Sequence, residues 1–90
     1  MVRIIEVRTT GQGLFEFTDR VREVVATSKI EEGLCTIMIQ HTSASLTIQE
    51  NADPSARYDL ECWLEQLVPE DNPNFTHTHE GPDDMPAHIK

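Results

Sequence analysis

The chain has 90 residues and a mass of 10.2 kDa, and this length accommodates a single domain, residues 1–90, since domains rarely fall far below about 50 residues. Apolar residues make up 38% and charged residues 26%, which differs from the charge-rich profile of disordered chains and predicts a folded chain with a thin core. Seven basic and sixteen acidic residues give a net charge of -9. That charge repels nucleic-acid backbones and anionic lipid surfaces, so neither is an expected partner.

The first residues give no indication of a membrane or secretory segment. No apolar run approaches the roughly 18 residues that cross a bilayer, and charged side chains interrupt residues 2–8 where a signal peptide would be apolar. We therefore expect a cytoplasmic protein. Cys35 and Cys62 have no CxxC spacing, and reduced thiols on buried faces fit a cytoplasmic protein better than a disulfide does.

The amino-terminal half predicts strands around one short helix. Residues 2–9 are rich in β-branched side chains, and a glycine turn at 11–13 leads to a hairpin partner at 14–17. A helix is predicted over residues 19–28, with Thr18 as its N-cap. Residues 34–41 then alternate apolar side chains on both faces, which is typical of a central strand.

The carboxy-terminal half predicts a fourth strand, a helix and a long loop. Residues 45–49 form a further short strand, and Asp53 followed by Pro54 is a strong helix start. The helix carries an apolar stripe that we interpret as core: Leu60, Trp63, Leu64 and Leu67. Residues 69–90 are rich in proline and lack periodicity, which predicts a loop. The order of elements favours an α+β fold, a largely antiparallel β-sheet with two helices packed on it.

Histidines and acids gather in the predicted loop. Three of the four histidines, His77, His79 and His88, lie there with Glu80, Asp83 and Asp84. Imidazole and carboxylate groups are common ligands of zinc and related ions. The spacing matches no compact zinc motif, so a solvated acidic loop is the alternative.

A second candidate lies where the central strand ends. His41 shares the face of the predicted core residues and is followed by Thr42, Ser43 and Ser45, which suits a cleft at a sheet edge. The alternatives are a buried structural histidine beside a turn, or a Ser–His pair, for which no G-x-S-x-G motif is present. Asn51 precedes a helix N-terminus, where backbone N–H groups can receive a phosphate.

Three segments together resemble one family. They are HTSASLTIQENADP at residues 41–54, LVPEDNP at 67–73 and HTHEGPDDMPAHIK at 77–90. In this order they are similar to the YjbQ-type proteins, which are described as secondary thiamine-phosphate synthases. The resemblance covers residues 33–90. It implies an α+β domain built on an antiparallel sheet, assembled as a homotrimer. The family pattern continues with more strands after the AHIK motif, so we expect the sheet to be incomplete here.

The resemblance also implies a reaction and a set of site residues. The reaction joins a pyrimidine methyl diphosphate to a thiazole phosphate with release of pyrophosphate, assisted by a divalent metal ion, zinc or magnesium. The implied metal ligands are His41, His77 and His88; His79 does not belong to the family pattern. Glu80 is expected as a proton acceptor or further ligand, with Asp83 and Asp84 in support. The expected phosphate contacts are Thr42, Ser43 and Asn51.

A second hypothesis assigns the same residues to another class of protein. In it the chain is a metal-binding or oligomer-forming domain without turnover, whose histidine-rich loop joins subunits. A catalytic ion keeps an open coordination position, whereas a structural ion is enclosed by four protein ligands. The number of ligands that the protein supplies therefore separates the two hypotheses.

Overall fold

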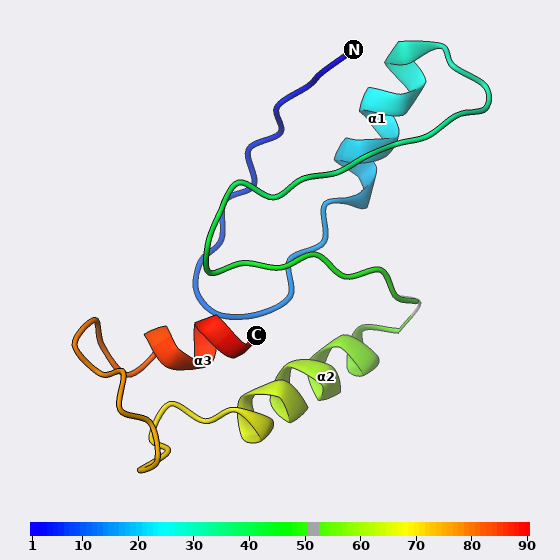
Figure 1. Cartoon of the computed structure of the whole chain (residues 1–90). Coiled ribbons are helices and arrows are strands. Elements are labelled where there is room, and N and C mark those ends of the chain that lie inside the picture. The colour runs from blue at the N-terminus through cyan, green and yellow to red at the C-terminus, as the bar shows by residue number, and fades with distance from the viewer. Residues whose placement is uncertain (51–52) are drawn as a thin grey trace. The chain divides into compact units, whose positions relative to one another are not determined.

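The computed structural model describes residues 1–50 and 53–90. Within them the elements are three helices, α1 (Thr18–Ser28), α2 (Pro54–Leu67) and α3 (Asp84–Ile89), in that order (Figure 1). The chain divides into two compact units, Met1–Ile37 with α1 and Met38–Lys90 with α2 and α3. Each unit is described by itself below.

Helix α1 follows Phe17, whose side chain makes no capping hydrogen bond. Asp19 lies in the first turn, where a carboxylate favours the positive end of the helix dipole. The helix ends at Ser28, because Lys29 adopts a left-handed conformation with φ 59° and donates its N–H to the carbonyl of Ala26. The predicted helix is confirmed, except that Thr18 lies inside it and does not cap it.

Helix α2 begins where the sequence predicts. The carboxylate of Asp53 accepts the backbone N–H of Ser55, and Pro54 occupies the first position, where its missing N–H costs nothing. The predicted core stripe is only partly correct. Leu60 and Leu64 are half-buried, whereas the side chains of Trp63 and Leu67 are 55% and 58% exposed.

Helix α3 lies inside the segment that the sequence predicts to be a loop, so that prediction is wrong for Asp84–Ile89. Pro86 is fully buried and is the third residue of the helix. At that position its missing N–H has no intrahelical partner to lose, so proline is compatible with the first turn. The backbone N–H of Ala87 donates to Asp83 and that of Lys90 donates to Pro86.

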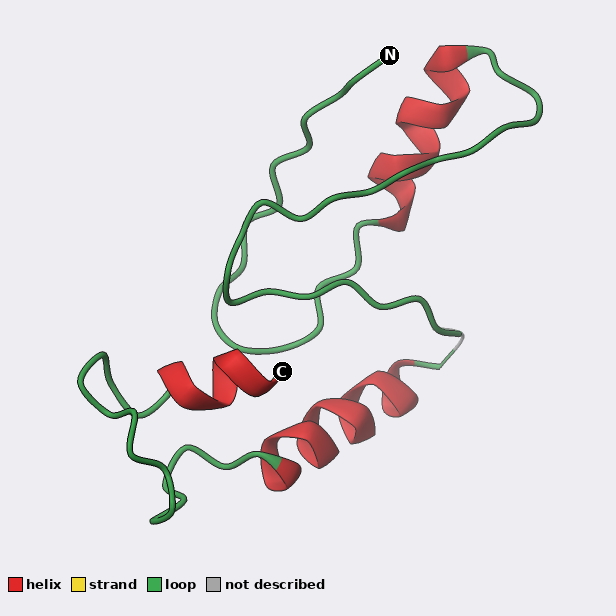
Figure 2. Ribbon diagram, in the orientation of Figure 1, coloured by secondary structure: helices red, strands yellow, loops and turns green. Residues whose placement is uncertain are grey.

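The predicted α+β fold is wrong for the described part of the chain. Residues 1–50 and 53–90 contain no strand, as Figure 2 shows by the absence of its strand colour. Residues expected to face a core are exposed, including Ile4 (85%), Leu34 (94%) and Ile48 (101%), and Cys35 is exposed as well. An alternating segment becomes a strand only when a neighbour pairs with its backbone groups, and no such ladder forms among these residues.

No helix in the described ranges has the length and apolar character needed to cross a membrane.

Candidate metal centre

Three side chains converge in the second unit, from α3 and from the segment before it. The Nε2 atom of His77 lies 2.5 Å from Oδ2 of Asp84, and Nε2 of His88 lies 3.1 Å from the same oxygen. The two imidazole rings meet edge to face, with centroids 5.2 Å apart. We call these three residues the His77–Asp84–His88 cluster.

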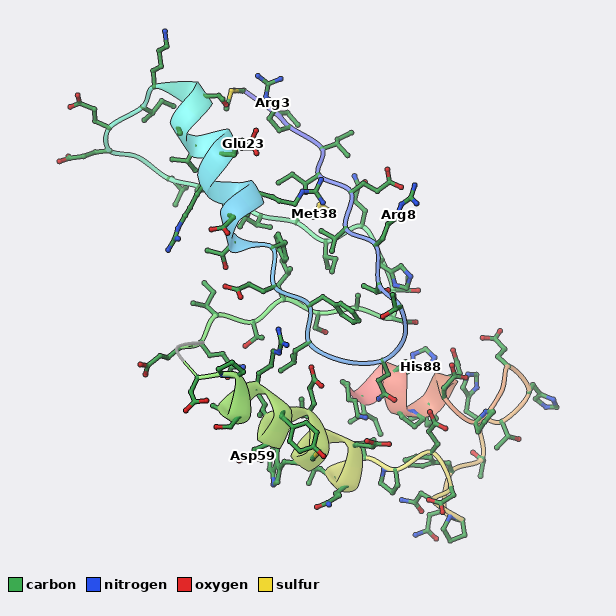
Figure 3. All side chains as sticks on the ribbon, turned by 180° about the vertical axis from the view of Figure 1, so that it is seen from behind. Arg3, Arg8, Glu23, Met38, Asp59 and His88 are labelled. Atoms are coloured by element: carbon green, nitrogen blue, oxygen red, sulfur yellow. The ribbon has the colours of Figure 1, made fainter. Side chains whose placement is uncertain are left out.

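Helix α3 supplies two members of the cluster. Asp84 and His88 are four residues apart, and this spacing places two side chains on the same helix face. Each also suits its position, because a carboxylate favours the first turn of a helix and an imidazole favours the last. Figure 3 shows the side chain of His88 on this helix. The pair is therefore set by secondary structure alone.

A tight turn brings His77 to the same point. The backbone N–H of Gly81 donates to the carbonyl of Thr78 at 3.2 Å, which reverses the chain between His77 and α3. Gly81 has a φ of +108°, a conformation that side chains rarely permit, and an added Cβ would lie 3.1 Å from Oδ1 of Asp83. Glycine at this position therefore allows the turn that carries His77 back to Asp84.

The donor set of the cluster suits a transition-metal ion. Its three ligand atoms all lie within 4.8 Å of one another. Tetrahedral zinc with bonds near 2.0–2.1 Å holds its ligand atoms roughly 3.3 Å apart, so only small shifts are needed to admit an ion. Two imidazole nitrogens and one carboxylate oxygen match zinc better than magnesium, which prefers oxygen ligands and retains water.

The cluster contains some of the predicted site residues and leaves out others. His77 and His88 were predicted as ligands, and Asp84, predicted in a supporting role, lies at the centre. Within the described residues His41, Glu80 and Asp83 do not join this group. Asn51 lies outside the described residues. The i,i+4 spacing of Asp84 and His88 is the sequence signal that would have indicated Asp84 as a ligand.

His41 lies in a turn that has its own hydrogen bonds. The backbone N–H of Ser43 donates to Nδ1 of His41 at 2.9 Å. Thr42 and Ser43 form the turn itself, and all three residues are exposed. The hydroxyl of Ser45 donates to the carbonyl of Lys90 at 2.9 Å, and Lys90 follows α3 directly. This bond joins the segment that contains His41 to the end of the helix that carries His88.

Comparison with known proteins shows which family this chain is similar to. The family described as UPF0047 protein YjbQ-like matches residues 3–90. UPF0047 protein sll1880 of Synechocystis is 49% identical over 97% of this chain and 59% of its own length. UPF0047 protein YjbQ of Escherichia coli O157:H7 is 40% identical over 98% of this chain and 64% of its own length. No solved structure gives a significant match.

The chain thus spans about 60% of the length of these relatives. The match extends through both compact units and includes the three segments that carried the resemblance. The thiamine-phosphate synthase activity that the resemblance implied stays a prediction. The chain belongs to the YjbQ-like UPF0047 family.

Proposed function

We propose that this chain binds a divalent transition-metal ion, with zinc the best match, through His77, Asp84 and His88. The proposal rests on one observation, the convergence of two Nε2 atoms on a single carboxylate oxygen at 2.5 and 3.1 Å. The side chain of Asp84 is 19% exposed while those of His77 and His88 are 45% and 55% exposed. The central ligand is therefore sheltered, and the cluster is still open to an incoming ion.

Isothermal titration calorimetry with zinc tests this proposal. The chain offers a matched pair of histidines, one inside the cluster and one outside it, for the comparison. His77→Ala removes a cluster residue, whereas His79→Ala removes an exposed histidine two positions away. We expect His77→Ala to weaken zinc binding by at least about tenfold, since even indirect support of a ligand is worth that much. His79→Ala should bind zinc like the unaltered chain. Equal losses in both variants would disprove the assignment.

The number of ligands favours a catalytic ion over a structural one. The cluster offers three candidate protein ligands, and zinc that is held by three protein ligands retains a position for water or substrate. We propose on this ground that the site serves the thiamine-phosphate synthase-type transfer, in which a bound ion would offset the charge of departing pyrophosphate. Glu80 is the proposed catalytic carboxylate, because it is exposed three residues from His77 and four from Asp84.

An assay of pyrophosphate release, with the pyrimidine methyl diphosphate and the thiazole phosphate as substrates, tests the transfer separately from metal binding. We expect Glu80→Gln to lose the activity and keep its zinc affinity, since Glu80 lies outside the cluster. Glu70→Gln, a change in the same type of side chain outside the His77–Lys90 segment, is the control and should keep both. Release that is equally fast with and without Glu80 would refute its role.

The second candidate is a metal-binding domain without turnover that joins copies in a homotrimer. It predicts that a fourth protein ligand completes the coordination of zinc. Cobalt substitution distinguishes the candidates, because added pyrophosphate alters the visible spectrum of an open site and leaves that of a closed site unchanged.

A further inference from the structure

The hydrogen bond between Ser43 and His41 fixes the protonation of the His41 ring. A backbone N–H can only donate, so Nδ1 of His41 must accept, and the distance of 2.9 Å is that of a normal hydrogen bond. A neutral imidazole has one acceptor nitrogen and one donor nitrogen. The neutral ring of His41 therefore carries its proton on Nε2.

This protonation state is unsuited to a metal ligand. Nδ1 already accepts the N–H of Ser43, and binding through Nε2 would require the proton to move to Nδ1, where it would face that N–H. Metal-bound imidazoles usually donate their second nitrogen to an oxygen acceptor, and here the partner is a donor. The cluster residues differ, because in His77 and in His88 the nitrogen that faces Asp84 is Nε2 itself, so an arriving ion would take the place of the proton shared with that carboxylate.

We propose that His41 is an anion-binding residue, which donates Nε2–H to a phosphate oxygen of the substrate and does not bind the metal. This inference rests on the proposed function for the identity of the substrate. His41 is exposed, so Nε2–H is accessible to a ligand. A neutral N–H donor also hydrogen-bonds a phosphate oxygen without adding to the net charge of -9, which disfavours phosphates.

The place of His41 in the second unit supports this role. Ser45 donates to the carbonyl of Lys90, and Lys90 lies two residues beyond His88. A hydrogen bond therefore joins the segment that follows the His41 turn to the end of the helix that carries two of the proposed metal ligands, Asp84 and His88. A diphosphate that met an ion at the cluster would find its additional donor in a segment joined to the same helix.

Nitrogen-15 NMR of the histidine rings tests the proposal with zinc and inorganic pyrophosphate as probes. We expect His41 to show an unprotonated Nδ1 and a protonated Nε2, and to keep that pattern when zinc is added. Pyrophosphate should shift the His41 Nε2 resonance, in the presence and in the absence of zinc. Loss of the Nε2 proton on addition of zinc would overturn the proposal, because it would make His41 a ligand.

Two substitutions complete the test. His41→Ala should weaken pyrophosphate binding by about tenfold or more, the effect of one hydrogen bond to a charged acceptor, and leave zinc affinity unchanged. His41→Gln places an amide N–H near the position of Nε2 and should restore most of the binding. Equal pyrophosphate affinity in all three proteins would overturn the proposal. Absence of zinc binding would refute the proposed function alone, because the His41 measurements can be made without zinc.

Discussion

The imidazole rings of His77 and His88 meet edge to face, with centroids 5.2 Å apart and planes inclined at 72°. This arrangement directs both Nε2 atoms to one oxygen of Asp84, at 2.5 and 3.1 Å. The three donors are thus brought together before any ion arrives. The predictions below test this arrangement and the local structure around it.

The two adjacent aspartates should differ in their effect on zinc binding. Asp84→Asn leaves a weaker and uncharged ligand between the two histidines, so we expect at least about a tenfold loss of zinc affinity. Asp83→Asn changes the neighbouring side chain, which precedes α3 without capping it, and should leave the affinity nearly unchanged. Titration calorimetry measures both. A larger loss for Asp83→Asn would show that the ligand has been assigned to the wrong residue.

Replacing Gly81 by alanine should weaken zinc binding through the backbone. Alanine at a φ of +108° is strained and its Cβ would crowd Asp83, which we expect to cost about 1 kcal/mol or more. The turn that positions His77 would then open. Gly11→Ala is the control, because Gly11 also has a positive φ, with open space around it, and lies in the first unit. It should leave zinc affinity unchanged.

The stability of α2 should depend on pH through Asp53. Its pKa lies below the ordinary value of 3.8 because the backbone N–H and then the hydroxyl of Ser55 donate to the carboxylate. A lowered folded-state pKa means that the stabilisation is present above 3.8 and is lost as the pH falls through the lower folded-state value. Circular dichroism should show helix loss in that range.

Asp53→Asn provides the control for this titration. Asparagine caps a helix about as well as aspartate, but it does not titrate. We expect the variant to keep its helix at neutral pH and to lose the acid-dependent step that Asp53 contributes. An unchanged acid transition would assign the step to other carboxylates.

Ultraviolet titration should show that the pKa of the single tyrosine lies above 10.0. The pKa of Tyr58 is raised from 10.0, first by its side-chain hydrogen bond with Cys62, one turn further along α2, and then by the electrostatic interaction with the same residue. Cys62→Ala should therefore lower the pKa of Tyr58 toward 10.0. Cys35→Ala, which changes the other free cysteine, should not alter it. The chain has one tyrosine, so the signal belongs to that residue.

The chain should self-associate in solution. Ile4, Leu34 and Ile48 are at least 85% exposed, and association removes such apolar side chains from water, which is favourable. Sedimentation velocity should show a species larger than the 10.2 kDa monomer, with the homotrimer as the expected product. Leu34→Ser should shift the distribution toward the monomer. A monodisperse monomer at all concentrations would contradict the prediction.

The sequence predicts two of the three helices because their signals are local. Asp53 and Pro54 define the start of α2 within two adjacent positions, and the end of α1 at Ser28 was also predicted correctly. The strands were predicted from side-chain alternation, which says nothing about whether a neighbouring segment pairs with them. Helix α3 was missed because residues 69–90 are rich in proline and lack periodicity, although the first turn of a helix accepts a proline such as Pro86.

The candidate site could be predicted in composition and only partly in geometry. The histidines and acids of residues 77–88 stand out in the sequence, and His77 and His88 were predicted as ligands. That Asp84 lies between them depends on α3, which the sequence did not predict. The bond from Ser45 to Lys90 spans 45 positions of the chain, and no local pattern indicates a contact of that separation.

The distribution of the three donors along the chain has a kinetic consequence. Asp84 and His88 are held on one helical turn, so an arriving ion meets a ready two-point attachment. His77 belongs to the segment before the helix, and the turn at Gly81 already holds it against the same carboxylate. Capture of an ion should therefore occur in a single second-order phase, whose observed rate rises in proportion to the concentration of metal.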